Sequence, residues 1–156
     1  MPEWFDVSAA LPGLGGACVH VVAAKREGEV RRVLRAGGFG LRTLDGGSVL
    51  SDRSFFREVG RALAFPSHFG HNWDALQDLL GDLARGGERR IALFWCAADR
   101  SFEADPQSAV DAFVAFSRAA EDLASEAPPT QLEVFLLGDG PGFGRLRGLT
   151  GDDSQE

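Results

Sequence analysis

Four short runs of the chain are rich in apolar, β-branched or aromatic residues, as is typical of strands covered on both faces of a parallel sheet. Glycine, proline or charged residues bound each run and indicate where a strand stops. The predicted strands are residues 17–24, 39–44, 89–98 and 131–138.

Between these strands, apolar residues recur with the helical period, so each intervening segment has one apolar face. Ser51 or Asp52 can cap one helix, Asn72 can cap the next, and Pro106 takes the first helical position after Asp105. The predicted helices are residues 25–36, 52–63, 72–84 and 106–125. The residues expected to face the core are Val30, Val33, Leu34, Phe55, Phe56, Val59, Leu63, Trp73, Leu76, Leu79, Leu80, Leu83, Val110, Phe113, Val114, Phe116 and Leu123.

The alternation of strands and helices predicts the α/β class, with parallel strands joined by right-handed crossovers. The chain has 156 residues and is 44% hydrophobic, a size that suits one packed core. Residues 139–156 are rich in glycine and polar residues, and we expect a flexible acidic tail with little order beyond Leu149.

The net charge of −7 and the pI near 4.9 narrow the class of partner. Nucleic acid and an anionic membrane surface would both repel this charge, so neither is expected as a ligand, and a basic protein fits better. The two cysteines, Cys18 and Cys96, lie in predicted strands and are expected to be reduced thiols. The first residues are acidic where a secretory signal is basic, so a cytoplasmic location is expected.

Asp74, Asp78 and Asp82 recur every four residues on the predicted helix that begins at Asn72. They therefore form one acidic ridge, opposite the leucine face. Like charges at this spacing repel one another by a few tenths of a kcal/mol per pair, so helix stability does not explain them. The ridge is either an ordinary solvated face or a surface that binds arginines and lysines of a partner.

The same stretch contains residue types that bind metals, because His68, His71 and Asp74 follow one another at three-residue intervals and Asp78 comes next. No cysteine or glutamate stands beside them to complete a strong zinc pattern. A histidine–aspartate acid–base pair is also conceivable, although no nucleophile motif accompanies it. A metal-dependent hydrolase using His68, His71 and Asp74 is therefore kept as the enzymatic alternative.

Glycine-rich stretches do not predict a nucleotide site. The stretch at residues 13–17 precedes a strand, which is the reverse of the order in a dinucleotide-binding turn. The stretch at residues 138–144 follows a strand but contains Pro141 and no convincing helix after it. No cofactor is expected.

The segment FFREVGRALAFPSHFGHNWDALQDLLGDL, residues 55–83, combines Phe-Pro, an aromatic residue before glycine, and Asn-x-Asp-Ala-Leu-x-Asp. In this combination it resembles the signature of the barstar family, small intracellular inhibitors of barnase-type ribonucleases. The order of elements from residue 39 to residue 138 agrees as well. The resemblance implies a barstar-like domain over residues 39–138, with a three-stranded parallel sheet that residues 1–38 would extend by one strand and one helix.

The resemblance also implies a mechanism without catalysis, in which the helix and the loop before it block the ribonuclease active site. Asp78 would occupy the cationic phosphate pocket of the enzyme, Asp74 would pair with a nearby arginine, Gly70 would allow a tight turn, and Trp73 would belong to the core. The residues implied at the partner surface are His68, Phe69, Gly70, Asn72, Asp74, Gln77, Asp78 and Asp82.

The chain departs from the family pattern at three places. His68 stands where a tyrosine is typical, Gln77 replaces a tryptophan, and Ser117 or Arg118 aligns with a glutamate. The loss of the tryptophan removes apolar contact area, and the reversed charge at Arg118 bears on which ribonuclease or toxin is bound more than on how it is bound. An acidic docking module for a basic protein that is not a nuclease is the non-enzymatic alternative.

Overall fold

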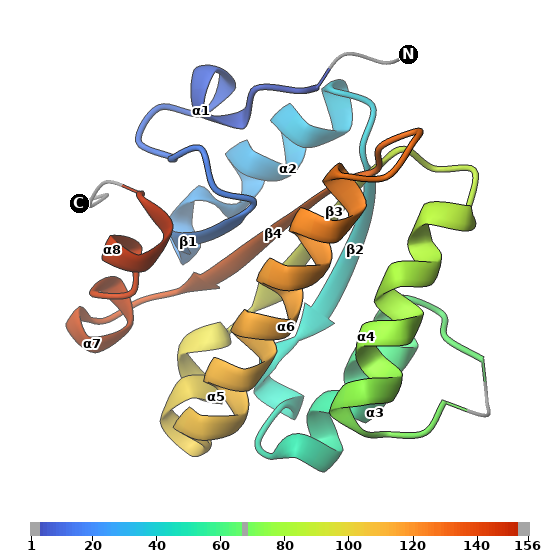
Figure 1. Cartoon of the computed structure of the whole chain (residues 1–156). Coiled ribbons are helices and arrows are strands. Elements are labelled where there is room, and N and C mark those ends of the chain that lie inside the picture. The colour runs from blue at the N-terminus through green and yellow to red at the C-terminus, as the bar shows by residue number, and fades with distance from the viewer. Residues whose placement is uncertain (1–3, 67–68, 153–156) are drawn as a thin grey trace.

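The computed structural model describes residues 4–66 and 69–152, which form one parallel sheet covered by helices on both faces (Figure 1). The strands are β1 (Val19–Ala23), β2 (Gly40–Asp45), β3 (Arg90–Cys96) and β4 (Gln131–Gly138), in the order β1-β4-β3-β2. The helices are α1 (Val7–Ala10), α2 (Glu27–Ala36), α3 (Asp52–Ala62), α4 (Trp73–Gly81), α5 (Ala98–Ala104), α6 (Pro106–Ala124), α7 (Pro141–Gly144) and α8 (Arg147–Thr150). The α/β class is confirmed.

The three strands implied by the family resemblance are β2, β3 and β4, and the strand near the N-terminus joins them at one edge. All three strand pairs are parallel, and β1 lies beside β4 with Val19 opposite Val134. The predicted extension is therefore part of the same sheet. The division into segments 1–38, 39–138 and 139–156 stays a prediction.

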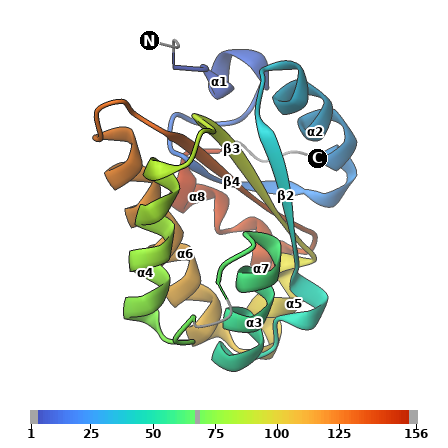
Figure 2. The same cartoon turned by 90° about the vertical axis from the view of Figure 1, so that its right-hand side faces the viewer.

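Alternate residues of the strands face two separate cores, as the pleat requires. On β3, Leu93 and Trp95 face the core formed with α3, α4, α5 and α6, whereas Ala92 and Phe94 face the core formed with α1 and α2. Figure 2 shows α2 on one side of the sheet and α4 and α6 on the other. The near-continuous apolar character of the strands thus reflects burial on both faces.

Side chains cover both edges of the sheet, where unpaired strands would otherwise invite aggregation. On the β2 edge, Glu58 accepts a hydrogen bond from the Asp45 backbone N–H at 2.7 Å, and Arg61 donates to the Thr43 carbonyl at 3.0 Å. On the β1 edge, the Asp152 carboxylate accepts a hydrogen bond from the Val21 N–H at 2.8 Å.

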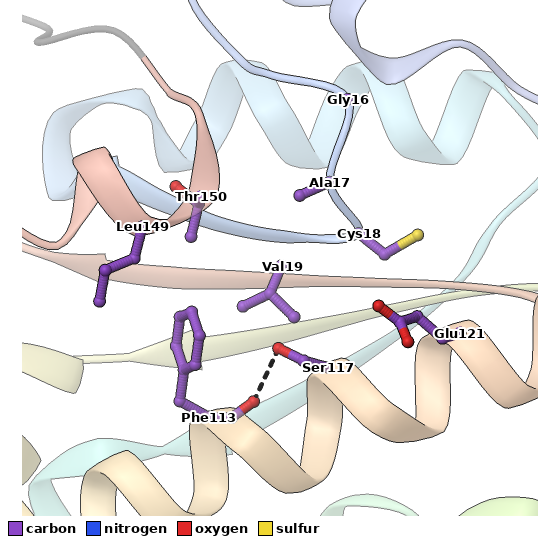
Figure 3. Close-up of a pocket in the computed structure, with 9 residues that line it drawn as sticks. All are labelled: Gly16, Ala17, Cys18, Val19, Phe113, Ser117, Glu121, Leu149 and Thr150. Atoms are coloured by element: carbon purple, nitrogen blue, oxygen red, sulfur yellow. Dashed lines mark hydrogen bonds between the residues drawn. The ribbon is translucent and has the colours of Figure 1, made fainter.

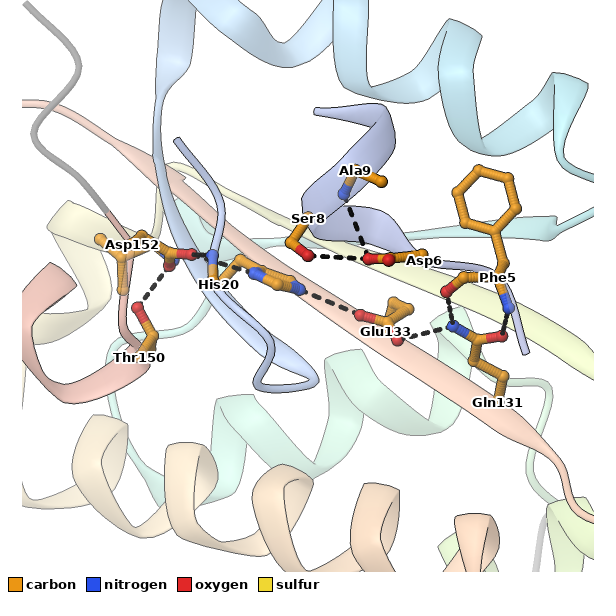
Figure 4. A network of polar contacts seen from close by, with 11 residues as sticks. Phe5, Asp6, Ser8, Ala9, His20, Gln131, Glu133, Thr150 and Asp152 are labelled. Carbon is orange, nitrogen blue, oxygen red and sulfur yellow. Dashed lines mark hydrogen bonds and ion pairs between the residues drawn. The ribbon is translucent and has the colours of Figure 1, made fainter. Parts of the chain in front are cut away.

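The expected flexible tail is wrong for residues 139–152. This segment forms α7 and α8 and then places Asp152 in the interior, 7% exposed. His20, which is fully buried on β1, lies between Asp152 at 3.1 Å and Glu133 at 3.0 Å (Figure 4). The Gly15 N–H and the Thr150 hydroxyl also donate to Asp152. Polar contacts between residues far apart in the sequence therefore help to order this segment, and local sequence patterns do not predict such contacts.

This His20–Asp152–Glu133 network predicts a stability that depends on pH. Burial alone would lower the pKa of His20, but its hydrogen bonds to Asp152 and Glu133 raise it from 6.5 to about 9. Because the pKa is raised in the folded state, protonated His20 contributes fully to the free energy of unfolding below pH 6.5, and this contribution is lost as the pH rises through about 9. Urea titrations across this pH range should show a loss of about 3 kcal/mol in the free energy of unfolding. A His20→Gln variant should not show this part of the pH dependence.

Two sequence expectations fail around α5 and α6. β3 ends at Cys96 rather than at residue 98, and the unpredicted helix α5 follows, held by a hydrogen bond from the Trp95 indole N–H to the Ser101 hydroxyl. Val110 and Val114, expected in the core, are 44% and 40% exposed. The reason is that α6 buries a face made largely of alanines, which allow its close approach to the sheet. None of the described helices is long and apolar enough to cross a membrane.

Candidate functional site

The helix that carries the acidic ridge starts at a well-defined cap. The Asn72 side-chain oxygen accepts a hydrogen bond from the Ala75 N–H at 2.8 Å, and its amide donates to the Gly70 carbonyl at 3.1 Å. Leu76 and Leu80 are fully buried against the core, which fixes the rotation of α4 about its axis. The cap and the leucines together hold the opposite face of α4 toward solvent.

Asp74 and Asp78 of the acidic ridge are exposed on this outer face of α4. The predicted helix over residues 72–84 is too long, because α4 ends at Gly81 and Asp82, also exposed, begins a 3-10 turn, Asp82–Arg85. Asp82 pairs with Arg85, three residues later on the surface. Among the described residues, neither Asp74 nor Asp78 has a hydrogen-bonding or ionic partner for its carboxylate. Two carboxylates one helical turn apart are therefore presented with their charge uncompensated, ready for a cationic surface.

The loop before α4 is partly a core element. Phe69 was implied at the partner surface, but it is only 8% exposed and packs edge-on against Phe56 and Phe65, with ring centroids 6.1 and 5.3 Å apart. Phe69 therefore anchors the loop rather than offering its ring to solvent. A Cβ at Gly70 would lie 3.2 Å from the Asn72 amide nitrogen, so a larger residue here would push against the cap side chain. His68 lies outside the described residues.

The described residues give the metal alternative no support. They contain no group of three or more His, Cys, Asp or Glu side chains arranged to hold a metal ion. The His71 ring instead lies edge-on to Phe69, with centroids 5.0 Å apart. The backbone of His71 has φ +49°, a left-handed conformation that turns the chain into the cap residue Asn72.

Removing the cap should destabilise the site locally and the fold modestly. Asn72→Ala is expected to cost about 1 kcal/mol, because the Ala75 N–H loses its acceptor. Asn72→Asp keeps a side-chain oxygen at this position and should retain most of that stability. Urea denaturation of both variants checks this, and equal losses in the two would show that the cap hydrogen bond is not what matters.

A shallow groove of about 360 Å³ separates α4 from α6, directly beside the acidic ridge. Its lining residues are Trp73, Asp74, Gln77, Asp111, Val114, Ala115 and Arg118. The structure thus brings Asp74 and Gln77, both implied by the resemblance, next to a face of α6. Sequence reasoning missed Val114 as a surface residue, because its spacing fits the apolar stripe of α6.

A second hollow, also about 360 Å³, lies on the other side of α6 against β1 and α8 (Figure 3). The Cys18 thiol lines it, and burial together with the nearby Glu133 raises the pKa of this thiol to about 12. The Ser117 hydroxyl in the same hollow donates to the Phe113 carbonyl at 2.9 Å. A protonated thiol and an engaged hydroxyl are poor nucleophiles, so the hollow offers no activated group.

A family model described as "Barstar (barnase inhibitor)" matches residues 39–135. The chain belongs to the barstar family. The match to the barstar model spans β2, α3, α4, β3, α5, α6 and most of β4, and therefore includes the acidic ridge and the groove. The elements before β2 and after β4 lie outside it. No curated protein matches the chain.

Proposed function

We propose that this barstar-family protein is an inhibitor, or immunity protein, that binds a barnase-type ribonuclease and blocks its active site without itself being an enzyme. The observation that carries the proposal is the pair of exposed, uncompensated carboxylates, Asp74 and Asp78, on a helix held rigid by its cap and core leucines. Family membership supplies the class of target.

The mechanism follows from the chemistry of ribonuclease active sites, which bind substrate phosphates with cationic side chains. A carboxylate on a rigid helix can take the place of a phosphate, forming charge-assisted hydrogen bonds without a bond that the enzyme can cleave. In this proposal Asp78 enters that pocket and Asp74 pairs with an arginine at its rim. Because α4 is ordered before binding, little conformational entropy is lost on association.

The overall charge supports the same partner. A net charge of −7 attracts a basic protein over a distance, which speeds association and makes it sensitive to salt. The two cysteines are free thiols, as suits a reducing compartment, and the proposal includes a cytoplasmic location.

The test measures cleavage of a fluorogenic RNA by barnase and by a panel of related ribonucleases, with the purified chain added at increasing ratios. We expect full inhibition of at least one enzyme at a ratio of one to one, weakening as salt is raised. If none is inhibited at micromolar concentration, the ribonuclease proposal is wrong. Retention of a basic protein that is not a nuclease, at low salt only, would then favour the docking-module alternative.

A further inference from the structure

We propose that α3 carries a basic face, Arg53 and Arg57, that binds Asp74 and Asp78 on α4 of a second copy of this chain. The protein then forms a dimer in which the two carboxylates are covered. The consequence for inhibition rests on the proposed ribonuclease-binding function, because such a dimer has to dissociate before α4 can reach an enzyme. The dimer itself does not depend on that function.

The first observation is that the basic face has no partner within its own chain. Arg53 and Arg57 are exposed and stand one helical turn apart on α3, away from the buried phenylalanines of that helix. Arg61, one turn further on, is different because it pairs with Glu58. Among the described residues, no hydrogen bond or ion pair engages the guanidinium of Arg53 or of Arg57. Their charge is therefore available to another molecule.

The second observation is that the two helix faces match in charge and in spacing. Asp74 and Asp78 also stand one turn apart, exposed and, within the described ranges, without an ionic partner. Four residues of helix rise by about 6 Å, so both arginines can meet both aspartates when the two helices lie alongside each other. Arginine and carboxylate can form two parallel hydrogen bonds, which fixes the alignment of the helices as well as the charge.

The third observation is that the two faces lie close together on one chain. The start of α4 packs on α3, where the ring centroids of Trp73 and Phe56 are 4.8 Å apart. Both helices lie on the side of the molecule that faces the viewer in Figure 2. A two-fold axis in front of this side places α3 of each copy against α4 of the other. One symmetric contact then pairs both basic faces with both pairs of aspartates, and association stops at a dimer.

An exposed apolar side chain lies at the N-terminal end of the basic face. Leu50 directly precedes the cap residue Ser51 of α3 and is 53% exposed. Exposed ion pairs contribute little binding energy each, and removing apolar area from water adds to it. Leu50 therefore gives the contact an apolar component beside its charges.

The net charge of −7 opposes contact between two copies at a distance. At physiological salt, charges farther apart than about 8 Å are largely screened, whereas pairs partly buried in a contact are screened much less. A contact between locally opposite charges can therefore hold two like-charged molecules together. Because this contact consists mainly of ion pairs, the dimer is weaker than the inhibitor–enzyme complex, and a ribonuclease that binds Asp74 and Asp78 displaces the second copy.

The test is analytical ultracentrifugation of the parent chain and of two charge-reversed double variants at physiological salt. One variant, Arg53→Glu with Arg57→Glu, reverses the basic face, and the other, Asp74→Arg with Asp78→Arg, reverses the acidic one. The parent should become dimeric as its concentration is raised, whereas each variant alone should stay monomeric because like charges then meet. An equimolar mixture of the two variants should dimerise, since α3 and α4 of one variant then oppose helices of opposite charge in the other.

The matched control is Arg32→Glu with Arg35→Glu, which makes the same change in charge at exposed positions of α2, on the opposite face of the sheet. This control should dimerise like the parent. A parent that stays monomeric at every concentration overturns the inference, and so does a mixture of the two reversed variants that remains monomeric.

Inhibition assays separate this inference from the proposed function. At concentrations where the parent is dimeric, the Arg53→Glu, Arg57→Glu variant keeps Asp74 and Asp78 and should inhibit the ribonuclease at least as tightly as the parent. A parent that dimerises as described but inhibits no ribonuclease supports the dimer and overturns the function. A parent that inhibits but never dimerises supports the function and overturns the dimer.

Discussion

Replacing Asp78 with alanine should weaken inhibition of the target ribonuclease by about 2–4 kcal/mol, or roughly thirtyfold to a thousandfold. Asp78 has no ionic or hydrogen-bonding partner within the described residues, so its charge is available to the enzyme. In the complex its carboxylate would be surrounded by desolvated cations. Truncation would leave those cations unpaired, which is why the expected loss is large.

The fold should not change in this variant. Asp78 is exposed, and its removal relieves repulsion with Asp74 and Asp82, so the melting temperature should stay the same or rise slightly. Glu103→Ala is the control, because Glu103 is an exposed acid on α5, away from α4 (Figure 2). The measurement is the inhibition constant of the parent, of Asp78→Ala and of Glu103→Ala, and only Asp78→Ala should differ from the parent. If Asp78→Ala inhibits as well as the parent, this residue does not carry the binding.

The second large effect concerns stability. Asp152→Ala should lower the free energy of unfolding by about 3–5 kcal/mol, as when one partner of a buried charged pair is removed. The loss has identifiable causes: the backbone N–H groups of Gly15 and Val21 lose their 2.8 Å acceptor, and His20 loses one of its two carboxylates. Burial raises the pKa of Asp152, but the hydrogen bond and the charge of His20 lower it more, so this pKa lies below its usual value.

Chemical denaturation of two further variants isolates this effect. Asp152→Asn retains a side-chain oxygen for the backbone donors, and it should be less destabilising than alanine. Asp139→Ala removes an exposed aspartate from the same C-terminal segment. Within the described residues its carboxylate accepts a single long hydrogen bond, from the Ala24 N–H at 3.4 Å, so this variant should be nearly neutral. Were Asp152→Ala as stable as the parent, the polar contacts of Asp152 would not be what stabilises the C-terminal segment.

Much of the core framework was predictable because its signals are local. These signals are the strand and helix periods, the cap residue Asn72 and the proline at the start of α6. Each one depends on a few neighbouring residues, and the corresponding elements are observed. The signature segment likewise led to the barstar family, which the family comparison bears out. Short α5 was missed because Ala97 and Ala98 continue the apolar run of β3 and the helix has only seven residues. It is held by hydrogen bonds of Ser101 with the Trp95 indole and with the Gly46 carbonyl.

The candidate site was predictable only in outline. The four-residue spacing places Asp74 and Asp78 on one face of α4, and their exposure follows from the buried Leu76 and Leu80 on the opposite face. The orientation of Phe69 does not follow from sequence, because this loop residue is buried by packing against Phe56 in α3. The same is true of the groove, since it exists only where α4 and α6 lie side by side.

By itself, then, the sequence determined the α/β class, most elements, the family signature and the acidic ridge, because these depend on side chains close together in the chain. The tertiary structure decided what depends on distant pairs. His20 and Asp152 meet across 132 positions and order the C-terminal segment, while the alanine face of α6 leaves Val110 and Val114 on the surface. Such contacts depend on how whole elements pack, and no local period encodes them.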